Sequence, residues 1–443
     1  ETVSLPPDLE RLAAVEAESE NALDLGSGGC VDDPVAMSPA SHLGEVWRGA
    51  IEASKSVRVL LNATVTRIDT DEAGRSATAV HFATLQNRRF HVAARFVVIA
   101  AGGIETARLL LLSDRTVPTG LGNRSGWVGR CFMDHPRFAW GQVTGLPRPG
   151  ALAGFDPTRG FGKPAPGVPK AGERLAFGHG IAIDRAVQRR EEILGSRTWI
   201  VPVAPQGERH GGRELREMVL WTSRGRIPAD AAMRIGKIVA DLPNAVAATL
   251  AHLKSIAGLT RNWQFVTMLE PEPDPDSRVT LDPGDRDAFG LPRVRLDWRL
   301  TPAVERSLRT AQRIIVESLR ARGFECAIEG PGGPRANQKF EDPRWTWHHM
   351  GTARMSADPS TGVVDADCRV HDMENLYVAG SAVFPTCSYD MPTLTLIALA
   401  HRLSEHLRHR LARPSAFVAE EPASAASSPQ AEPIAPPMIE ETA

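Results

Sequence analysis

Two adjacent histidines, His348 and His349, are the residues of this chain whose type and spacing best suit chemistry. They precede Gly351 and Thr352 in the run HHMGT, which reads as a loop. Histidine is the natural general base at neutral pH, because its ordinary pKa is about 6.5. A lone buried histidine is more often a hydrogen-bonded core residue, and the run HHM is too short to make a metal site. The surrounding elements must decide between a structural and a catalytic role.

The stretch that follows reads as a strand, a turn of small residues and a helix. The apolar run at residues 377–384 includes Gly380 and Ser381, and Pro392 stands where the first residue of a helix would. Apolar residues recur beyond it at near-helical spacing. The N–H groups and positive dipole end of such a helix attract electron-rich ligands. We therefore predict that Gly380, Ser381, Pro392 and Thr393 line a ligand site.

A second strand, turn and helix are indicated by VVIAAGGIETARLLLLS at residues 97–113. The turn contains Ala101, Gly102 and Gly103. Glycine adopts positive φ angles and lets the backbone approach another group closely. Two units of this kind fit a single ligand site built from distant segments, and we predict that Gly102 and Gly380 belong to one domain.

The glycine-rich unit that usually binds dinucleotides is absent from the sequence. That unit carries G-x-G-x-x-G after a strand, with an acidic residue about 20 positions further on. The runs GSGG at residues 26–29 and GPGG at residues 330–333 neither follow a strand pattern nor open a helix pattern. We interpret both as loops.

Four motifs carry a resemblance to a known family. HHMGTARM, GVVDADCRV, NLYVAGSAVFPT and PTLTLIALAHRL, in this order and spacing, resemble the C-terminal signature of the glucose-methanol-choline (GMC) flavin oxidoreductases. Residues 97–113, and GWVGRCFMDHP at residues 126–136, resemble two further segments of the same family. The resemblance implies FAD as the cofactor and oxidation of the CH–OH group of a sugar, polyol or other alcohol.

The resemblance also assigns residues. His348 stands three positions before Gly351, as the catalytic base does in the family's H-x-x-G-T motif, and His349 is then its neighbour. Val65 and the pair Ala101-Gly102 match positions that contact FAD. In the family the G-x-G-x-x-G unit lies at the N-terminus, so we expect that this chain lacks the first part of a GMC enzyme. A partner chain could supply it.

One position departs from the family pattern. The residue before P-T-L-T is Asn or His in the family, whereas here it is Met391, with Asp390 one position earlier. A thioether accepts hydrogen bonds weakly and donates none, so it cannot hold a substrate oxygen as an amide can. Three explanations stay open: Asp390 or His349 takes over the polar role, the substrate is unusual, or alcohol oxidation is impaired.

Three functions therefore remain in competition. The first is an FAD-dependent alcohol or sugar dehydrogenase or oxidase, with an electron acceptor that the sequence does not assign. The second is a flavin-containing lyase of the same family. The third is a non-catalytic or degenerate GMC-like subunit, which Met391 favours and the intact HHMGTARM opposes.

Composition excludes some other classes. The net charge of -2, with basic and acidic residues interspersed, argues against nucleic acid as a partner. Five scattered cysteines without C-x-x-C spacing indicate reduced thiols. No apolar run reaches transmembrane length, and a cytoplasmic location is expected.

The sequence predicts an α/β (α+β) protein of several segments, because 443 residues exceed one small core. Residues 1–38 form an N-terminal segment. Residues 39–136 form the first part of a three-layer FAD-binding domain, incomplete at its N-terminus, and residues 341–412 return to it with the active-site motif. Residues 137–340 form a GMC-type substrate-binding domain of antiparallel sheet and helices. Residues 413–443 read as a disordered tail.

Three element patterns are explicit enough to compare with a structure. Helices are expected at residues 9–23 and 302–323, the second with one apolar face. A strand is expected across residues 57–71, where β-branched residues are frequent.

Overall fold

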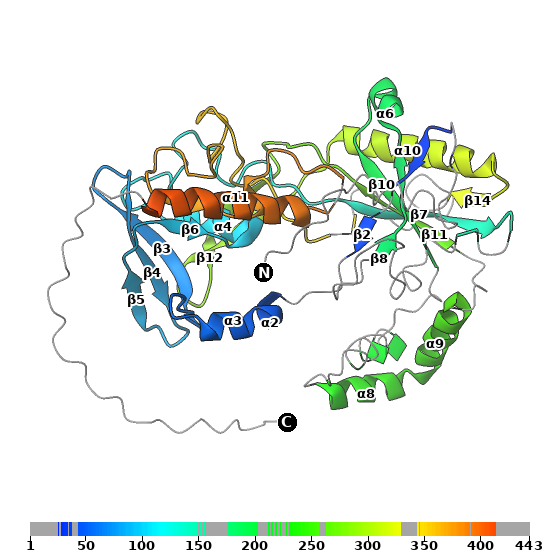
Figure 1. Cartoon of the computed structure of the whole chain (residues 1–443), viewed down its shortest axis with the longest axis horizontal. Coiled ribbons are helices and arrows are strands. Elements are labelled where there is room, and N and C mark those ends of the chain that lie inside the picture. Colours follow the sequence, from blue (N-terminus) through cyan, green and yellow to red (C-terminus); the bar gives the residue numbers. More distant parts are fainter. Residues whose placement is uncertain are drawn as a thin grey trace.

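The computed structural model of the chain (Figure 1) describes residues 25, 28–33, 35–37, 43–148, 151–152, 155, 176–202, 211–212, 214–215, 218, 222, 227, 230–256, 263–328, 343–344, 346–389 and 391–412. These residues form two buried cores. Both helices and sheets contribute to them, so the predicted mixed α/β class is confirmed. The helix expected at residues 9–23 and the tail at 413–443 lie outside the described residues.

The first core joins two segments that lie far apart in the sequence. Its buried residues come from residues 68–133, from Val279 and from residues 350–403. An antiparallel meander, a parallel strand pair and three helical elements surround it: β3 (Thr64–Thr70), β4 (Ala77–Ala83), β5 (Arg89–Val92), β6 (Val97–Ile99), β15 (Leu376–Val378), α4 (Gly102–Leu112), η2 (Ser381–Val383) and α11 (Thr393–Ala412).

The parallel pair β6–β15 decides where the glycine turns lie. Leu376 is paired with Val97 and Val378 with Ile99, and the Ala379 N–H donates to the Ile99 carbonyl at 2.8 Å. Because the strands are parallel, the turns that follow them meet at the same edge. Ligands of open α/β sheets bind outside that carboxyl edge.

A hairpin from the middle of the chain also packs on the first core. It consists of β12 (Arg278–Arg286) and β13 (Pro292–Asp297), and Val279 is buried in the core. The Arg108 guanidinium on α4 lies 2.5 Å from the Asp287 carboxylate and donates to the Pro292 carbonyl at 3.0 Å. The hairpin falls within the range 137–340 predicted for the substrate domain, yet it packs on α4 and on the first core.

The second core is formed on a six-stranded antiparallel sheet. Trp140 and Phe265 stack in it with ring centroids 4.6 Å apart. The sheet order is β1-β9-β10-β11-β7-β14. The strands and the helices near them are β1 (Cys30–Asp32), β7 (Arg137–Gly145), β9 (Ile181–Ile183), β10 (Ser196–Pro202), β11 (Trp263–Leu269), β14 (Glu325–Ile328), α6 (Arg185–Glu191) and α10 (Pro302–Arg320).

Helix α10 shows how the sequence pattern sets this packing. Its apolar residues at helical spacing form one buried face, while Arg309 and Arg313 on the opposite face are about half exposed. Burying each leucine or isoleucine contributes about 1.5–3 kcal/mol relative to leaving it in water. The buried residues of this face include Leu308, Ala311, Ile314, Ile315 and Leu319, as the spacing predicts.

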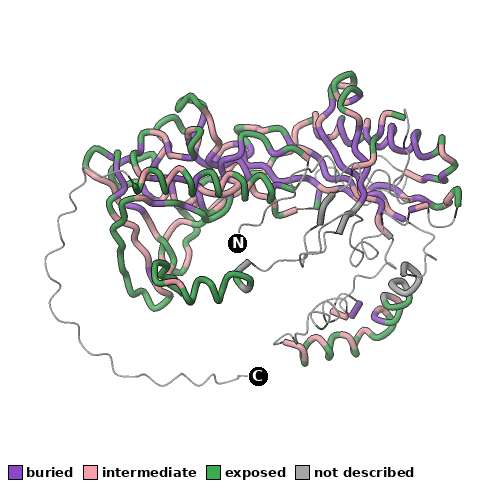
Figure 2. The backbone as a smooth tube through the Cα atoms, in the orientation of Figure 1, coloured by how far each residue is buried: buried purple, intermediate pink, exposed green. Residues whose placement is uncertain are grey.

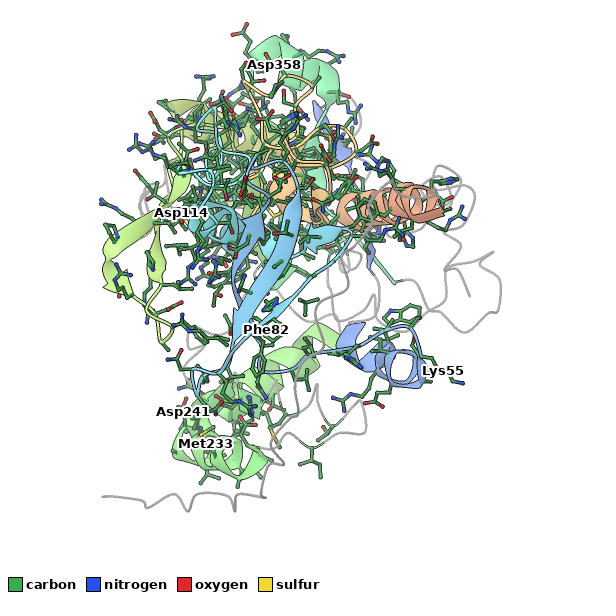
Figure 3. All side chains as sticks on the ribbon, turned by 90° about the vertical axis from the view of Figure 1, so that its left-hand side faces the viewer. Lys55, Phe82, Asp114, Met233, Asp241 and Asp358 are labelled. Atoms are coloured by element: carbon green, nitrogen blue, oxygen red, sulfur yellow. The ribbon has the colours of Figure 1, made fainter. Side chains whose placement is uncertain are left out.

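The remaining named elements lie outside the sheets just described: β2 (Val35–Met37) paired with β8 (Ala176–Gly178), α2 (Leu43–Val46), α3 (Arg48–Ala53), α8 (Ala231–Ala240) and α9 (Leu242–Ile256). Figure 3 labels Met233 and Asp241 on the α8–α9 pair, at the opposite end of the view from Asp358. Within the described residues, no helix combines the length and apolarity needed to cross a bilayer.

Two local expectations are corrected by the structure. The strand expected at residues 57–71 begins only at Thr64, because an extended segment needs a neighbouring strand and none is paired with residues 57–61 among those described. Pro392 is the N-cap and not the first helical residue, since its carbonyl accepts the Leu396 N–H at 2.9 Å and α11 starts at Thr393.

Candidate active site

The histidine loop is held against the segment that connects the two cores. Met133 and Met350 exchange backbone hydrogen bonds of 3.0 and 2.9 Å, and Arg137 and Arg344 exchange bonds of 3.2 and 3.0 Å. The two segments thus run antiparallel. Residues 134 and 135 of one segment consequently face the histidines of the other.

Asp134 fixes the backbone of the loop. Its fully buried carboxylate accepts N–H groups from Thr346 at 3.3 Å, Trp347 at 3.2 Å and His348 at 2.9 Å. Trp347 has a φ of 64°, a left-handed conformation that is strained for a bulky side chain. Such a turn points successive N–H groups toward one anion. The buried carboxylate therefore holds His348 in place from its backbone.

His135 holds the same histidine from its side chain. The Nδ1 atoms of His135 and His348 lie 2.9 Å apart, and the two rings are close to perpendicular at 85°. The Nε2 of His135 lies 2.8 Å from the Ser388 carbonyl oxygen. His135 is fully buried, while His348 is partly exposed, so only the outer histidine of the pair is accessible to a small molecule.

The two glycine turns meet the same loop. The Ser381 hydroxyl donates to the His349 carbonyl at 2.7 Å, and the Gly351 N–H donates to the Ser381 carbonyl at 3.2 Å. A Cβ on Gly103 would lie 2.6 Å from the His349 carbonyl oxygen, so only glycine allows helix α4 to start this close. The Thr352 hydroxyl donates to the Gly103 carbonyl. The histidine loop and the two glycine turns therefore form one packed unit.

Gly102 and Gly380 are the open part of this unit. Their φ angles are 76° and 115°, and a Cβ built on either would meet no atom within 4 Å. Both glycines have a backbone conformation that other residues rarely adopt, at the carboxyl edge of the parallel pair. A flat ligand could approach the backbone here without meeting a side chain.

The second sheet reaches the site through the loop at Ser388. Glu270 follows β11, and its carboxylate accepts the backbone N–H groups of Gly195 and Ser388. Burial raises the pKa of this carboxyl group, and those two hydrogen bonds act against the rise. The Arg197 guanidinium lies 5.6 Å from the centroid of the Tyr389 ring and is paired with Asp33 at 2.6 Å. The six-stranded sheet thereby positions the loop that His135 contacts.

The structure brings together some of the predicted site residues. His348, His349, Gly380 and Ser381 are in one packed unit, and Ala101 and Gly102 precede its Gly103. The other predicted site residues lie on different elements. Val65 lies on β3 and is 41% exposed; Met391 is 45% exposed; Pro392 is buried and Thr393 exposed at the start of α11. Asp390 lies outside the described residues.

Sequence reasoning missed the neighbours of the catalytic candidate. The motif GWVGRCFMDHP carries part of the family resemblance, but the resemblance assigns no role to Asp134 or His135 within it. The adjacent Asp and His before Pro136 were a usable signal, because such a pair supplies both an acceptor and an imidazole. His348 lies 213 positions after His135, and no local pattern in the sequence indicates that the two meet.

Acid is expected to destabilise the fold through His135. Burial lowers the pKa of this imidazole from 6.5 to about 4; the Ser388 carbonyl opposes the change and His348 adds to it. Between pH 4 and pH 6.5 this histidine binds a proton in the unfolded chain but not in the folded chain. Stability from this group is therefore complete above pH 6.5 and falls toward pH 4, by about 3 kcal/mol in total.

Urea unfolding of wild type and His135→Gln at pH 7 and pH 4.5 measures this loss. Glutamine keeps a hydrogen-bond donor and an acceptor but does not titrate, so the variant should lose about 2 to 3 kcal/mol less than wild type on acidification. His91→Gln, at an exposed position of β5, controls for removing a histidine as such. An equal benefit in that control would contradict the assignment to His135.

Comparison with known families identifies the class of protein. Residues 41–137 and 273–400 match the N-terminal and C-terminal family descriptions for GMC oxidoreductase. The chain belongs to the GMC oxidoreductase family.

The chain is also similar to individual proteins. The chain is 25% identical to the fructose dehydrogenase large subunit of Gluconobacter japonicus, over 84% of this chain and 58% of that protein. It is 27% identical to 2-methyl-1,2-propanediol dehydrogenase of Mycolicibacterium austroafricanum, over 82% and 56% respectively. An FAD-dependent oxidoreductase from Chaetomium thermophilum superimposes with a TM-score of 0.47 and 16% identity, over 84% of this chain and 65% of that one. The chain thus spans less than two thirds of the length of each.

Proposed function

We propose that this chain carries the catalytic base and one wall of the flavin site of an FAD-dependent oxidoreductase. The enzyme would act on the CH–OH group of a sugar, polyol or other alcohol. The observation that carries the proposal is the fixed position of His348 beside two open glycine turns. The names of the relatives, a fructose and a diol dehydrogenase, support an alcohol as the substrate class.

The residues present fit part of FAD. Gly102 and Gly380 leave room for a flat ring system at the carboxyl edge of β6 and β15. Ala101, Ser381 and the start of α11 at Pro392 and Thr393 would contact the same group, with Val65 on the adenine side as the family resemblance implies. When bound, FAD supplies the hydride acceptor.

The protein's part of the reaction is proton transfer and positioning. His348 takes the proton of the substrate hydroxyl as the hydride leaves the carbon, which is the usual work of a general base and is worth roughly 100-fold or more in rate. Asp134 fixes the backbone of this base, and His135 fixes its ring. Met391 offers the substrate oxygen only a weak acceptor.

A further polypeptide segment is proposed to complete the flavin site. Val98, on the parallel strand β6, is 41% exposed, although strands of parallel pairs are normally covered on both faces. Figure 2 shows much of β5, α3 and the start of α11 as exposed tube. Large apolar side chains are exposed on these and adjoining stretches: Val57, Val59, Leu60, Leu61, Phe90, Leu394 and Ile397. Large apolar side chains left in water are a feature of interaction surfaces. A dinucleotide-binding unit from the same or a partner chain would cover it.

Anaerobic mixing with a panel of alcohols tests the proposal. The flavin-loaded protein, with the completing segment present, is expected to lose its absorbance near 450 nm with at least one sugar or polyol. Release of an aldehyde and cyanide from a cyanohydrin, without any change in flavin absorbance, would favour the lyase alternative. Flavin that binds but reacts with neither class of compound would favour the non-catalytic alternative.

A further inference from the structure

The hydrogen bonds around His135 determine which of its nitrogens carries a proton. Its Nε2 lies 2.8 Å from the Ser388 carbonyl oxygen, and a carbonyl can only accept. The Nε2 atom must therefore carry the hydrogen. In a neutral imidazole the other nitrogen, Nδ1, then holds the lone pair.

His135 stays neutral in the folded protein at physiological pH. It is fully buried, and its pKa is lowered to about 4, chiefly because burial penalises the charged form. A doubly protonated His135 would direct an N–H at His348, and this form is absent near neutral pH. The Nδ1 of His135 is accordingly an acceptor toward its neighbour.

The same reasoning then applies to His348. Its Nδ1 lies 2.9 Å from an acceptor, so this nitrogen carries the hydrogen and donates. We propose that His135 is a positioning residue that holds His348 in the tautomer protonated on Nδ1, so that the basic lone pair of His348 is on Nε2. The proposal rests on the proposed function, in which His348 is the base.

The support for His135 extends into the second sheet. The Ser388 carbonyl that orients it belongs to a residue with a φ of 56°, whose N–H is bound by the partly buried Glu270 carboxylate. A line of hydrogen bonds therefore runs from Glu270 through Ser388 and His135 to His348. Serine proteases orient their base histidine in a comparable way, with a carboxylate in the place of this carbonyl and imidazole.

Asp134 and His135, in the segment that connects the two cores, both act on the same base. Asp134 binds the backbone N–H of His348 and His135 binds its ring, so two consecutive residues set the position and the tautomer. A glutamine at position 135 could reproduce both bonds, with its amide N–H directed to Ser388 and its carbonyl to His348. A leucine could reproduce neither.

Ring-nitrogen NMR of the full chain tests the tautomer directly. Histidines labelled with 15N in the ring distinguish a protonated Nδ1 from a protonated Nε2 in long-range proton–nitrogen spectra. The two signals among the 13 histidines are assigned by their loss in His348→Ala and His135→Leu. In the wild-type protein we expect His348 to be protonated on Nδ1 and His135 to be protonated on Nε2. In His135→Gln we expect His348 to keep its proton on Nδ1. In His135→Leu the His348 proton should move largely to Nε2.

Kinetics provide the second measurement on the flavin-loaded protein. Flavin reduction should slow roughly 100-fold or more in His135→Leu, the scale of a base held in the wrong tautomer, and less than about tenfold in His135→Gln. A wild-type His348 protonated on Nε2 would overturn the proposal, as would equal rate losses in the two variants. Should His135→Leu fail to fold, the wild-type and His135→Gln spectra still decide.

The variant His348→Ala separates the positioning role of His135 from the proposed role of His348 as the base. If His348→Ala leaves flavin reduction unchanged, His348 is not the base and the positioning role falls with it, whatever the spectra show. If His348→Ala abolishes reduction but the His348 proton is on Nε2 in wild type, the base stands and the role of His135 is wrong.

Discussion

His348→Ala is expected to slow reduction of bound flavin by an alcohol roughly 100-fold or more. Alanine removes the proton acceptor that lies partly exposed beside the glycine turns. Flavin content should stay nearly unchanged, because the Asp134 carboxylate binds the backbone N–H at position 348, which alanine keeps. Stopped-flow absorbance of the flavin-loaded protein under anaerobic conditions measures the rate.

His349→Ala is the matched control. The His349 ring packs between Phe132 and Trp347, at centroid distances of 5.5 and 6.2 Å, and its bond to Ser381 is made by the backbone carbonyl. A smaller loss of rate is therefore expected than for His348→Ala. An unchanged rate in His348→Ala together with a collapse in His349→Ala would mean that the base is the other histidine.

Asp390→Asn addresses the departure at Met391. If Asp390 takes over the polar role that Met391 cannot fill, its loss should cost about as much as the loss of His348. A rate near that of wild type would instead leave His348, oriented by His135, as sufficient for proton removal.

The 443-residue chain expressed by itself is expected to retain far less than one FAD per chain. The FAD pyrophosphate normally rests on a helix N-terminus behind a G-x-G-x-x-G turn, and the sequence contains no such unit. The glycine turns after β6 and β15 offer only part of the cofactor's contacts.

Flavin absorbance relative to protein concentration after gel filtration measures this content. The FAD-dependent oxidoreductase from Chaetomium thermophilum, purified in the same way, serves as the positive control. Co-expression with a segment that carries the G-x-G-x-x-G unit should restore flavin if that segment covers the exposed surface. A yellow 443-residue protein with one FAD per chain would contradict the expectation.

Local patterns in the sequence were sufficient for several elements. The apolar spacing of residues 302–323 predicted α10 and its buried face, because helical periodicity alone decides which side chains share a face. The signals at residues 97–113 predicted the β6–α4 unit, and those at residues 377–384 predicted strand β15 and the glycine turn after it. The 3-10 turn η2 was not predicted. Motif spacing selected His348 over His349. Each of these depends on residues close together in the chain.

Residues 57–61 show where local pattern fails. Their β-branched and leucine side chains favour a strand, yet the structure leaves Val57, Val59, Leu60 and Leu61 exposed and outside any strand. A strand is stabilised by its neighbour and not by its own sequence. The pattern therefore reports a preference that only a pairing partner can satisfy.

The sequence by itself determined the family, the cofactor class and the candidate base, because these are written in short motifs. Tertiary structure alone decided what surrounds that base. Asp134 and His135 meet His348 across more than two hundred positions, and Glu270 reaches Ser388 from another sheet. Such contacts arise from the packing of two cores against one connecting segment, and no spacing along the chain encodes them. The proton position on His348 follows from that packing and from nothing nearer in the sequence.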